Sequence, residues 1–570
     1  MNRIIGYLKP YTAKMTQGLV IKFVGTVMDL ALPWVLAYLI DTVAPQENIP
    51  MVYFWGVVML VCSVLAVLAN IIANRMAAIV ARDATRIIRH DLFNKMMGLS
   101  LNQIDKFTMP SLISRLTSDT YNIHRTIGMM QRMGVRAPIL LLGGVTVTMM
   151  LDARLSLVLI ATLPLITVAV VLISRKGMPL FTAVQEAGDR MVRTVRDGVM
   201  GIRVIKALSK GAYEADRFRF HNADMAKKET KASLVMGVTN PVMNIFLNGG
   251  LAAVILTGAY LVNNGTTEPG KIIAFMSYFL IILNAMLMVN RLFVMFTQAA
   301  ASAKRIAEVL DTLPDLQTEP STAIREDKHI VFDRVCFAYS GKEEALSDIS
   351  FSLNRGETLG IIGETGSGKT TLIHLLQRLY DVSGGQIRIE GENIKSIPPG
   401  RLRQMFGVAF QSDAFFADTI LENVELGRNL PASQVENALR CAQAWDFVME
   451  KPGGLQYKLT AKAMNLSGGQ KQRILIARAL AGNPSILILD DSSSALDYET
   501  DARMRTAIRT YFKETTVILV AHRISSVMNA ESILVLEDGR VAGLGNDTHL
   551  METCVVYRET AQVQMGGYLA

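Results

Sequence analysis

Cysteine is scarce in this sequence, and the placement of the few cysteines excludes two kinds of stabilised fold. Cys62, Cys336, Cys441 and Cys554 are widely spaced and form no Cys-x-x-Cys pair. Neither a disulfide framework nor a zinc site is therefore predicted. Charge is also low, at 19% of residues, whereas 50% of residues are hydrophobic. This composition excludes an ordinary soluble protein, and the length of 570 residues predicts more than one domain.

A secretory signal is not expected, because Met1-Asn2-Arg3 opens a short amphipathic stretch without a small-residue cleavage pattern. Long apolar runs follow instead, and a run of about 20 residues can cross a bilayer. The third run is short, so its helix is predicted to continue past Arg136, whose side chain can snorkel. The six predicted spans are Leu19–Ile40, Val52–Ala73, Ala137–Leu151, Leu155–Ser174, Val238–Val262 and Ile272–Asn290.

Lysine and arginine are distributed unevenly between the loops that join these spans. Segment 41–50 has none, and segments 152–154 and 263–271 have one each, whereas 75–136 has ten and 175–231 has thirteen. The positive-inside rule then places both long loops and both termini in the cytoplasm, as in a multi-pass protein of a bacterial inner (plasma) membrane. Much of the net charge of +8 lies in these loops. The predicted partner is therefore the lipid bilayer, and no nucleic acid is expected.

Asp29 is an ionisable residue inside the first predicted span. Such residues are costly in a membrane and commonly serve function. Asp29 also precedes Pro33, so its carboxylate could instead satisfy backbone groups that the proline frees. The sequence leaves both interpretations open.

Prolines and mixed polar residues interrupt the helical pattern in segment 310–329. This predicts a membrane domain over residues 1–310, a linker over 311–328 and a second domain over 329–570. In the last of these, short apolar strands alternate with helical patterns, which indicates an α/β sheet.

A glycine-rich segment follows the predicted buried strand 358–362 and precedes a predicted helix, 371–380. In this context it matches a P-loop, in which backbone N–H groups and the helix N-terminus bind phosphates. Lys369 would neutralise the β- and γ-phosphates of ATP, and the Thr370 hydroxyl would bind Mg²⁺. The residues predicted to contact the nucleotide here are Gly363, Glu364, Thr365, Gly366, Ser367, Gly368, Lys369, Thr370 and Thr371.

Two further strands end in polar residues. Asp490 closes the buried strand 486–489 and is a predicted Mg²⁺ ligand, directly or through water. His522 follows the strand 516–520. Because parallel strands present their carboxyl ends at one edge, both are predicted to lie beside the bound nucleotide.

A second anion-binding helix end is predicted at Leu466-Ser467-Gly468-Gly469-Gln470, before the helical run 471–480. Ser467 can cap this helix. One γ-phosphate does not need two such sites from one domain. The second site therefore suggests that the chain also binds the nucleotide of a partner.

These motifs, in this order behind six spans, resemble an ATP-binding cassette (ABC) half-transporter of the exporter type. The resemblance covers nearly the whole chain. It implies a six-span α-helical domain of the type IV exporter kind, followed by an α/β P-loop NTPase domain with an antiparallel β subdomain and a helical signature subdomain. It also implies coupling helices near Ser111–Arg115 and Gly211–Phe218, at the tips of the long loops.

The resemblance implies roles for residues outside the P-loop. Tyr339 stacks on adenine, Gln411 contacts Mg²⁺ and senses the membrane domain, and His522 contacts the γ-phosphate. The Mg²⁺ ligands are then Thr370, Gln411 and Asp490, and the catalytic residues are Asp491, His522 and Gln411. Two domains dimerise head to tail, so a partner's ATP is bound in trans by Ser467, Gly468, Gly469, Gln470 and Asp497, the last from the D-loop Ser494-Ala495-Leu496-Asp497.

Two departures from the family pattern bear on activity. Segment 460–465 lacks the acidic and glycine residues that are common before the signature. Asp491 stands where the family has Glu to align the attacking water, and it is one methylene shorter. Because a displacement of about 1 Å can cost on the order of 100-fold in rate, hydrolysis at this chain's own site is predicted to be weak.

The intact signature beside Asp491 predicts a heterodimer in which this chain carries the weak ATP site. A homodimer with two slow sites is the alternative. The predicted function is ATP-driven export of drug-like, lipid or peptide substrates. Import on an exporter-type fold, with a siderophore-like substrate, and a regulatory ATP-binding subunit are the other possibilities.

Overall fold

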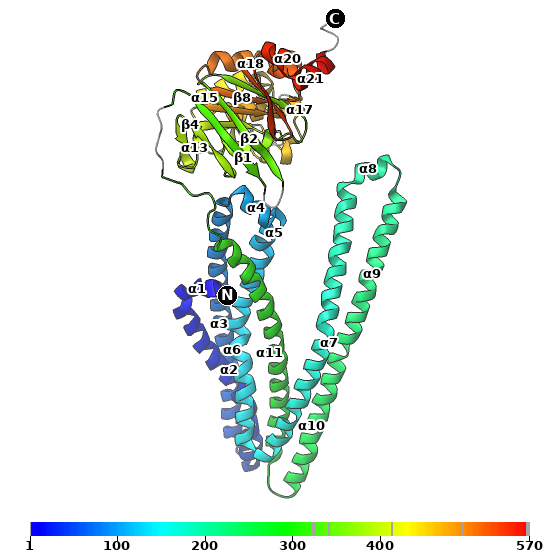
Figure 1. Cartoon of the computed structure of the whole chain (residues 1–570). Helices are drawn as coiled ribbons and strands as arrows, with labels where there is room; N and C mark the ends of the chain where they lie inside the picture. Colours follow the sequence, from blue (N-terminus) through cyan, green and yellow to red (C-terminus); the bar gives the residue numbers. More distant parts are fainter. Residues whose placement is uncertain (1, 321–325, 340–342, 412–413, 493, 566–570) are drawn as a thin grey trace. The chain divides into compact units, whose positions relative to one another are not determined.

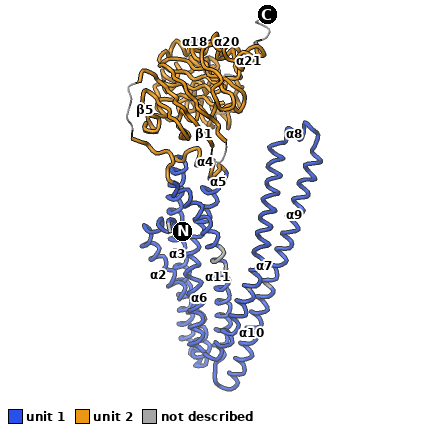
Figure 2. Tube along the Cα trace, in the orientation of Figure 1, with its two compact units in different colours: residues 1–97, 110–312 blue, residues 98–109, 313–570 orange. Residues whose placement is uncertain are grey.

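The computed structural model describes residues 2–320, 326–339, 343–411, 414–492 and 494–565. The chain forms two compact units (Figure 2). Residues 1–97 and 110–312 form the first, which we call the helical unit. Residues 98–109 and 313–570 form the second, the α/β unit. The short segment 98–109 thus belongs with the second half of the sequence.

The helical unit contains six helices long and apolar enough to cross a membrane, as predicted. They extend well beyond the predicted spans: α3 has 49 residues and α7 has 48. The third continues past Arg136, as expected, because α6 begins at Thr120. The helices of this unit are α1 (Asn2–Gly6), α2 (Thr12–Tyr38), α3 (Ile49–Met97), α5 (Met109–Ser114), α6 (Thr120–Leu151), α7 (Ala153–Met200), α8 (Ile202–Ala207), α9 (Gly211–Gly237), α10 (Thr239–Asn263) and α11 (Pro269–Leu310).

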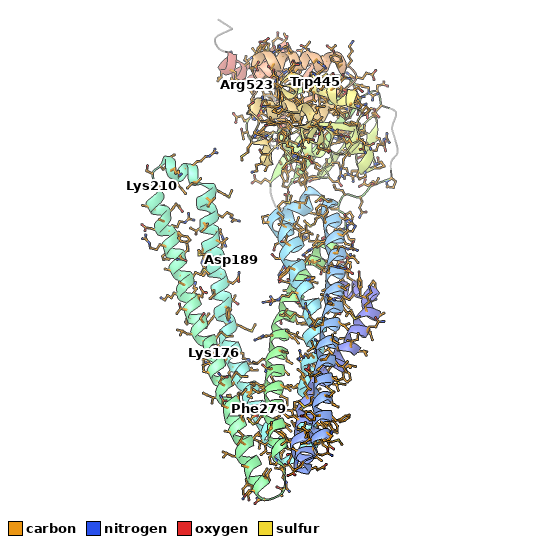
Figure 3. The ribbon with its side chains drawn as sticks, turned by 180° about the vertical axis from the view of Figure 1, so that it is seen from behind. Lys176, Asp189, Lys210, Phe279, Trp445 and Arg523 are labelled. Carbon is orange, nitrogen blue, oxygen red and sulfur yellow. The ribbon has the colours of Figure 1, made fainter. Side chains whose placement is uncertain are left out.

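Helices α2, α3, α6 and α11 pack together in the helical unit. The buried side chains of Leu30, Leu140, Tyr278 and Ile282 form part of their shared core. The hydroxyl of Tyr278 donates to the Leu30 carbonyl at 2.5 Å. Helices α7 and α9 pack along each other and are joined by α8, so they form a separate hairpin with Lys210 at its turn (Figures 1 and 3).

The short helices at the loop tips lie earlier in the chain than predicted. At the first tip, α4 (Leu101–Phe107) begins ten residues before Ser111, and Ser111–Arg115 lies on the returning arm. At the second, α8 ends at Ala207, and Gly211–Phe218 opens the long helix α9. Ser100 explains the first difference, because its side chain accepts from the Gln103 amide and completes a capping box that starts α4.

The α/β unit contains two sheets, as the predicted fold class requires. An antiparallel sheet has the order β2-β1-β4-β5, and a six-stranded sheet has the order β10-β9-β3-β8-β7-β6, in which all neighbours but β10 and β9 are parallel. The strands are β1 (Ile330–Ala338), β2 (Glu344–Leu353), β3 (Thr358–Gly363), β4 (Gly384–Ile389), β5 (Glu392–Asn393), β6 (Phe406–Ala409), β7 (Ile486–Asp490), β8 (Thr516–Val520), β9 (Ser532–Glu537) and β10 (Arg540–Gly545).

The central strands of the larger sheet are buried on both faces. In β7, Leu487 and Leu489 join one hydrophobic core, whereas Ile486 and Ile488 join another. Because both faces of β7 are buried, every residue of Ile486–Leu489 is apolar, which gives the continuous apolar run in the sequence. The helices of the unit are α4, α12 (Lys369–Leu376), α13 (Pro399–Met405), α14 (Ile420–Glu425), α15 (Ala432–Cys441), α16 (Trp445–Met449), α17 (Gly468–Leu480), α18 (Tyr498–Tyr511), α19 (Ile524–Val527), α20 (Asp547–Thr553) and α21 (Val555–Met565).

Candidate functional site: a nucleotide-binding edge

The glycine-rich loop connects β3 to α12, in the strand–loop–helix order that the sequence predicts. Gly366 and Gly368 have φ of +93° and +99°, which side chains rarely allow. A Cβ on Gly368 would also lie 2.5 Å from the Leu346 side chain. Glycine is therefore required at position 368 for the loop to turn tightly into the helix.

Lys369 is held inside this loop. Its Nζ donates to the carbonyls of Gly363 at 2.8 Å and Glu364 at 2.7 Å. Burial lowers the pKa of the ammonium, while the charges of Asp490 and Asp491 act in the opposite direction. The buried Ser367 hydroxyl has no hydrogen-bond partner among the described residues. An ammonium and an unsatisfied hydroxyl beside the N-terminus of a helix suit the phosphates of a nucleotide.

Three predicted magnesium ligands meet at one cleft. Thr370, Gln411 and Asp490 line a cavity of about 570 Å³ beside the start of α12. Asp490 is 5% exposed; burial, and then the charge of Asp491, raise the pKa of its carboxyl, while Lys369 and His522 lower it. A hydroxyl, an amide oxygen and a carboxylate are hard oxygen donors of the kind that Mg²⁺ prefers. These residues therefore fit a magnesium ion.

Asp491 directly follows β7 in a left-handed conformation, with φ of +47°. Aspartate tolerates this region better than most residues. Its backbone N–H donates to the Val520 carbonyl at 3.0 Å, and its carboxylate accepts from Gln411 Nε2 at 3.3 Å. Residues 80 positions apart in the sequence are thus joined at the edge where Asp490 ends its strand.

His522 follows β8, the strand next to β7, and is exposed. Its backbone is fixed by Gln564 on α21, which donates Nε2 to the His522 carbonyl at 2.8 Å and accepts from the Ile524 N–H at 2.8 Å. The sequence prediction did not identify Gln564. No local signal marks it, because the contact joins residues 42 positions apart.

Tyr339 follows β1 and lies near the start of α12. Its hydroxyl is 3.2 Å from Thr371 Oγ1, and its ring makes edge contacts with Phe337 and Tyr380. The proposed adenine platform is therefore next to the phosphate loop in the same unit.

The predicted signature caps α17. Ser467 Oγ accepts from the Gln470 N–H at 3.3 Å, and Gln470 Oε1 accepts from the Ser467 N–H at 3.1 Å, which forms a capping box. Gln472 joins this helix to the D-loop by bonds with Ser494 Oγ and the Ala495 N–H. Among the described residues, no hydrogen bond joins the signature to the P-loop. Asp497 has a local role as well, because it caps α18 by accepting from the Thr500 N–H at 2.8 Å.

Comparison with known proteins agrees with this arrangement. The family model of the ABC transporter transmembrane region matches residues 15–286, and the model described as ABC transporter matches residues 346–494. An uncharacterized ABC transporter ATP-binding protein, YfiB of Bacillus subtilis, is 34% identical over 99% of both chains. The chain belongs to the ABC transporter family.

Two further matches are a relative with a named activity and a solved structure with the same fold. An ATP-dependent lipid A-core flippase of Methylobacillus flagellatus is 30% identical over 85% of this chain and 83% of its own. A bacterial Atm1-family ABC exporter, solved with ATP bound, has the same fold, with a TM-score of 0.84 and 24% identity over 97% of this chain and 99% of its own. The ABC transporter described here is therefore a membrane protein with an exporter-type fold and an ATPase domain that binds ATP.

The segment before the signature of this ABC transporter is a short 3₁₀ turn, Ala461–Ala463, in which Lys462 and Ala463 have positive φ values of 59° and 47°. Asn465 closes the turn, because its Oδ1 accepts from the N–H and the hydroxyl of Thr460 at 3.1 Å. The residues that depart from the family pattern thus build a turn stabilised by side-chain hydrogen bonds.

Residues of segment 98–109, which the sequence analysis of this ABC transporter did not predict to have a role, form hydrogen bonds with the rest of the α/β unit. Tyr380, which contacts the ring of Tyr339, donates to Asp105 of α4 at 2.8 Å. Ser100 donates to Asp315 at 2.7 Å, and Gln103 donates to the Leu313 carbonyl. Within the α/β unit, α4 is thus attached both beside Tyr380, which contacts Tyr339, and at the start of the unit's main segment.

Proposed function

We propose that this chain is one half of an ATP-driven exporter, with its ATPase domain and both termini on the cytoplasmic side of a bacterial inner membrane. The observation that carries the proposal is the separation of two anion sites in one ATPase domain. The P-loop edge is assembled with its lysine and its magnesium ligands. In the part of the chain that the structure describes, no hydrogen bond joins the signature to the P-loop, and Gln472 of the signature helix bonds to the D-loop instead. A second half-transporter is needed to place a nucleotide against the signature.

Exposed apolar side chains on the α7–α9 hairpin are a second argument for such a partner. Its apolar side chains include Val199, Val204 and Leu208, which are between 62% and 67% exposed. Apolar patches of this kind mark interaction surfaces. The bound partner is a second ABC half-transporter, and the exported molecules are drug-like, lipid or peptide substrates, of which the flippase relative favours lipids.

The dimer is asymmetric in this proposal, because Asp491 is one methylene shorter than Glu. Its backbone is fixed by the bond to Val520, so the carboxylate cannot move forward to make up the difference. The water that attacks the γ-phosphate is then poorly aligned at this chain's own site. The signature Ser467–Gln470 is intact and serves the competent site of the partner.

In the mechanism that follows, backbone N–H groups of the P-loop and Lys369 hold the phosphates, and Tyr339 covers the adenine. Mg²⁺, held by Thr370, Gln411 and Asp490, would neutralise phosphate charge. His522 contacts the γ-phosphate, and its backbone is held in place by Gln564. Closure of two ATPase domains around ATP moves the membrane helices through α4 and α8, and hydrolysis resets them.

ATPase measurements on the reconstituted full-length chain test this proposal. The chain alone should hydrolyse ATP slowly, through pairs in which the signature of one copy faces the P-loop of another, and Asp491→Glu should raise that rate on the order of 100-fold. Asp538→Glu is a matched control, because Asp538 lies in the exposed β9–β10 turn with a φ of +46° and should have no effect. Full activity of the chain alone, abolished by Asp491→Asn, would disprove the asymmetric dimer.

A further inference from the structure

An apolar groove runs between α2 and α6 in the helical unit. Its volume is about 720 Å³, and its lining includes Phe23, Val27, Trp34, Ile139 and Leu142. Several of these side chains are open to the surroundings: Phe23 is 53% exposed, Trp34 45% and Leu142 66%. The groove can therefore hold an elongated apolar group such as an acyl chain.

Two arginines lie on the groove side of α6. Successive intervals of three or four residues separate Arg132, Arg136, Ile139 and Gly143, so all four share one helix face. Ile139 and Gly143 line the groove, and the arginines precede them by about one to three helical turns. A cationic end thus continues the apolar groove along α6.

These cations have too few carboxylates to balance them. Arg136 pairs with Asp29 at 2.9 Å, and Asp29 is the single acidic residue in α2 and α6. Arg132 donates its Nε to the Gly128 carbonyl of its own helix. Arg136 Nε is buried and has no hydrogen-bond partner among the described residues.

Lys22 adds a third cation. It is 2% exposed, and its Nζ donates to Asn74 Oδ1 at 3.1 Å. The charges of Arg136 and Arg132 repel its ammonium, and the carboxylate of Asp29 attracts it. A buried ammonium is costly unless an opposite charge compensates it. Three cations and one carboxylate leave a surplus that an anion can neutralise.

We infer that Arg132 and Arg136 bind the phosphate headgroup of an anionic lipid from the cytoplasmic leaflet, with an acyl chain in the α2–α6 groove, while the buried Lys22 adds uncompensated positive charge. Lys22 and Arg136 lie at the ends of the first and third predicted spans that face the cytoplasm in the proposed orientation, and the groove continues toward the opposite side. Anionic lipids are attracted to basic residues at this depth. The inference rests on the orientation in the proposed function and adds the chemical class of a ligand.

Trp34, inside the groove, provides a direct probe, since the chain has only three tryptophans. The full-length protein would be placed in nanodiscs of zwitterionic lipid with a small fraction of brominated phosphatidylglycerol or, separately, brominated phosphatidylcholine. Bromine quenches tryptophan at short range, and the same measurement on Trp34→Phe gives the background from Trp55 and Trp445. We expect the anionic lipid to quench Trp34 at a lower mole fraction than the zwitterionic lipid.

Arg132→Gln removes one charge without breaking a contact to another helix, and we expect it to reduce the preference for the anionic lipid about fivefold. Arg175→Gln, on an exposed site of α7, is the matched control and should keep the preference. The inference would be overturned if both lipids quenched Trp34 equally. It would also be overturned if Arg132→Gln and Arg175→Gln reduced the preference for the anionic lipid by the same factor. The lipid-binding measurement uses no ATP, so its outcome does not depend on ATPase activity. A failure of the ATPase or transport assays would therefore count against the proposed function and not against the lipid site.

Discussion

The N-termini of α12 and α17 both bind anions in the proposed exporter, but they are built differently. At α12 the loop turns through glycines with positive φ and holds Lys369 by two of its own carbonyls. At α17 the Ser467–Gln470 capping box occupies a helix N–H group, and no lysine of the described segments is hydrogen-bonded inside the signature in the way that Lys369 is held by the P-loop carbonyls. The first site carries its own counter-charge for a triphosphate. The second supplies hydrogen bonds and a helix end, which suits a γ-phosphate already held by another chain.

The largest expected effect tests whether the α12 site binds ATP through its own positive charge. Lys369→Ala removes the ammonium that neutralises phosphate charge, so the affinity of this chain for ATP should fall by about 2–5 kcal/mol in binding free energy. Isothermal titration with ATP measures it. Lys513→Ala, at an exposed position, serves as control and should bind ATP normally. Unchanged affinity in Lys369→Ala would show that the loop backbone alone holds the nucleotide.

A smaller effect tests the α17 site. Ser467→Ala removes the cap and should cost about 1 kcal/mol of unfolding free energy. It should also lower the ATPase activity of the partner's site in an assembled dimer, without changing ATP binding at this chain's own P-loop. Asn546→Ala is the matched control, because Asn546 caps α20 by accepting from the His549 N–H at 2.9 Å.

Both cap variants should therefore lose similar stability in thermal unfolding. Only Ser467→Ala should lose ATPase activity. If the two variants lose activity equally, the signature serves stability rather than a nucleotide, and the contrast between the two helix ends disappears.

The sequence predicted those features of the site that depend on near neighbours. Ser467 was identified as a cap from its motif, and β7 and β8 were identified from short apolar runs. The same reasoning could have found α4, because Ser100 and Gln103 have the capping-box spacing that starts it.

Long-range contacts were beyond the sequence. The pair of Asp29 with Arg136 joins positions 107 apart, and nothing in either helix specifies which residue faces the other. The same holds for the bond between Tyr380 and Asp105, which are 275 positions apart. Such contacts depend on how helices pack, and the packing is set by many apolar contacts of similar energy.

The smallest expected effect concerns His522, an exposed residue that follows β8 and is proposed to contact the nucleotide bound at α12. Gln564→Ala breaks the two bonds that hold the backbone at His522 and Ile524, so the imidazole should become less well placed. We expect kcat to fall about fivefold, corresponding to about 1 kcal/mol in the activation barrier, with little change in KM for ATP. The background for this measurement is the Asp491→Glu variant, whose own site should turn over fast enough to quantify.

Gln562→Ala, at an exposed position on the same helix, should leave kcat unchanged. A rise in KM with constant kcat would mean that Gln564 supports nucleotide binding in general, whereas a selective fall in kcat would place the effect at the γ-phosphate, the one part of the nucleotide that both helix ends share.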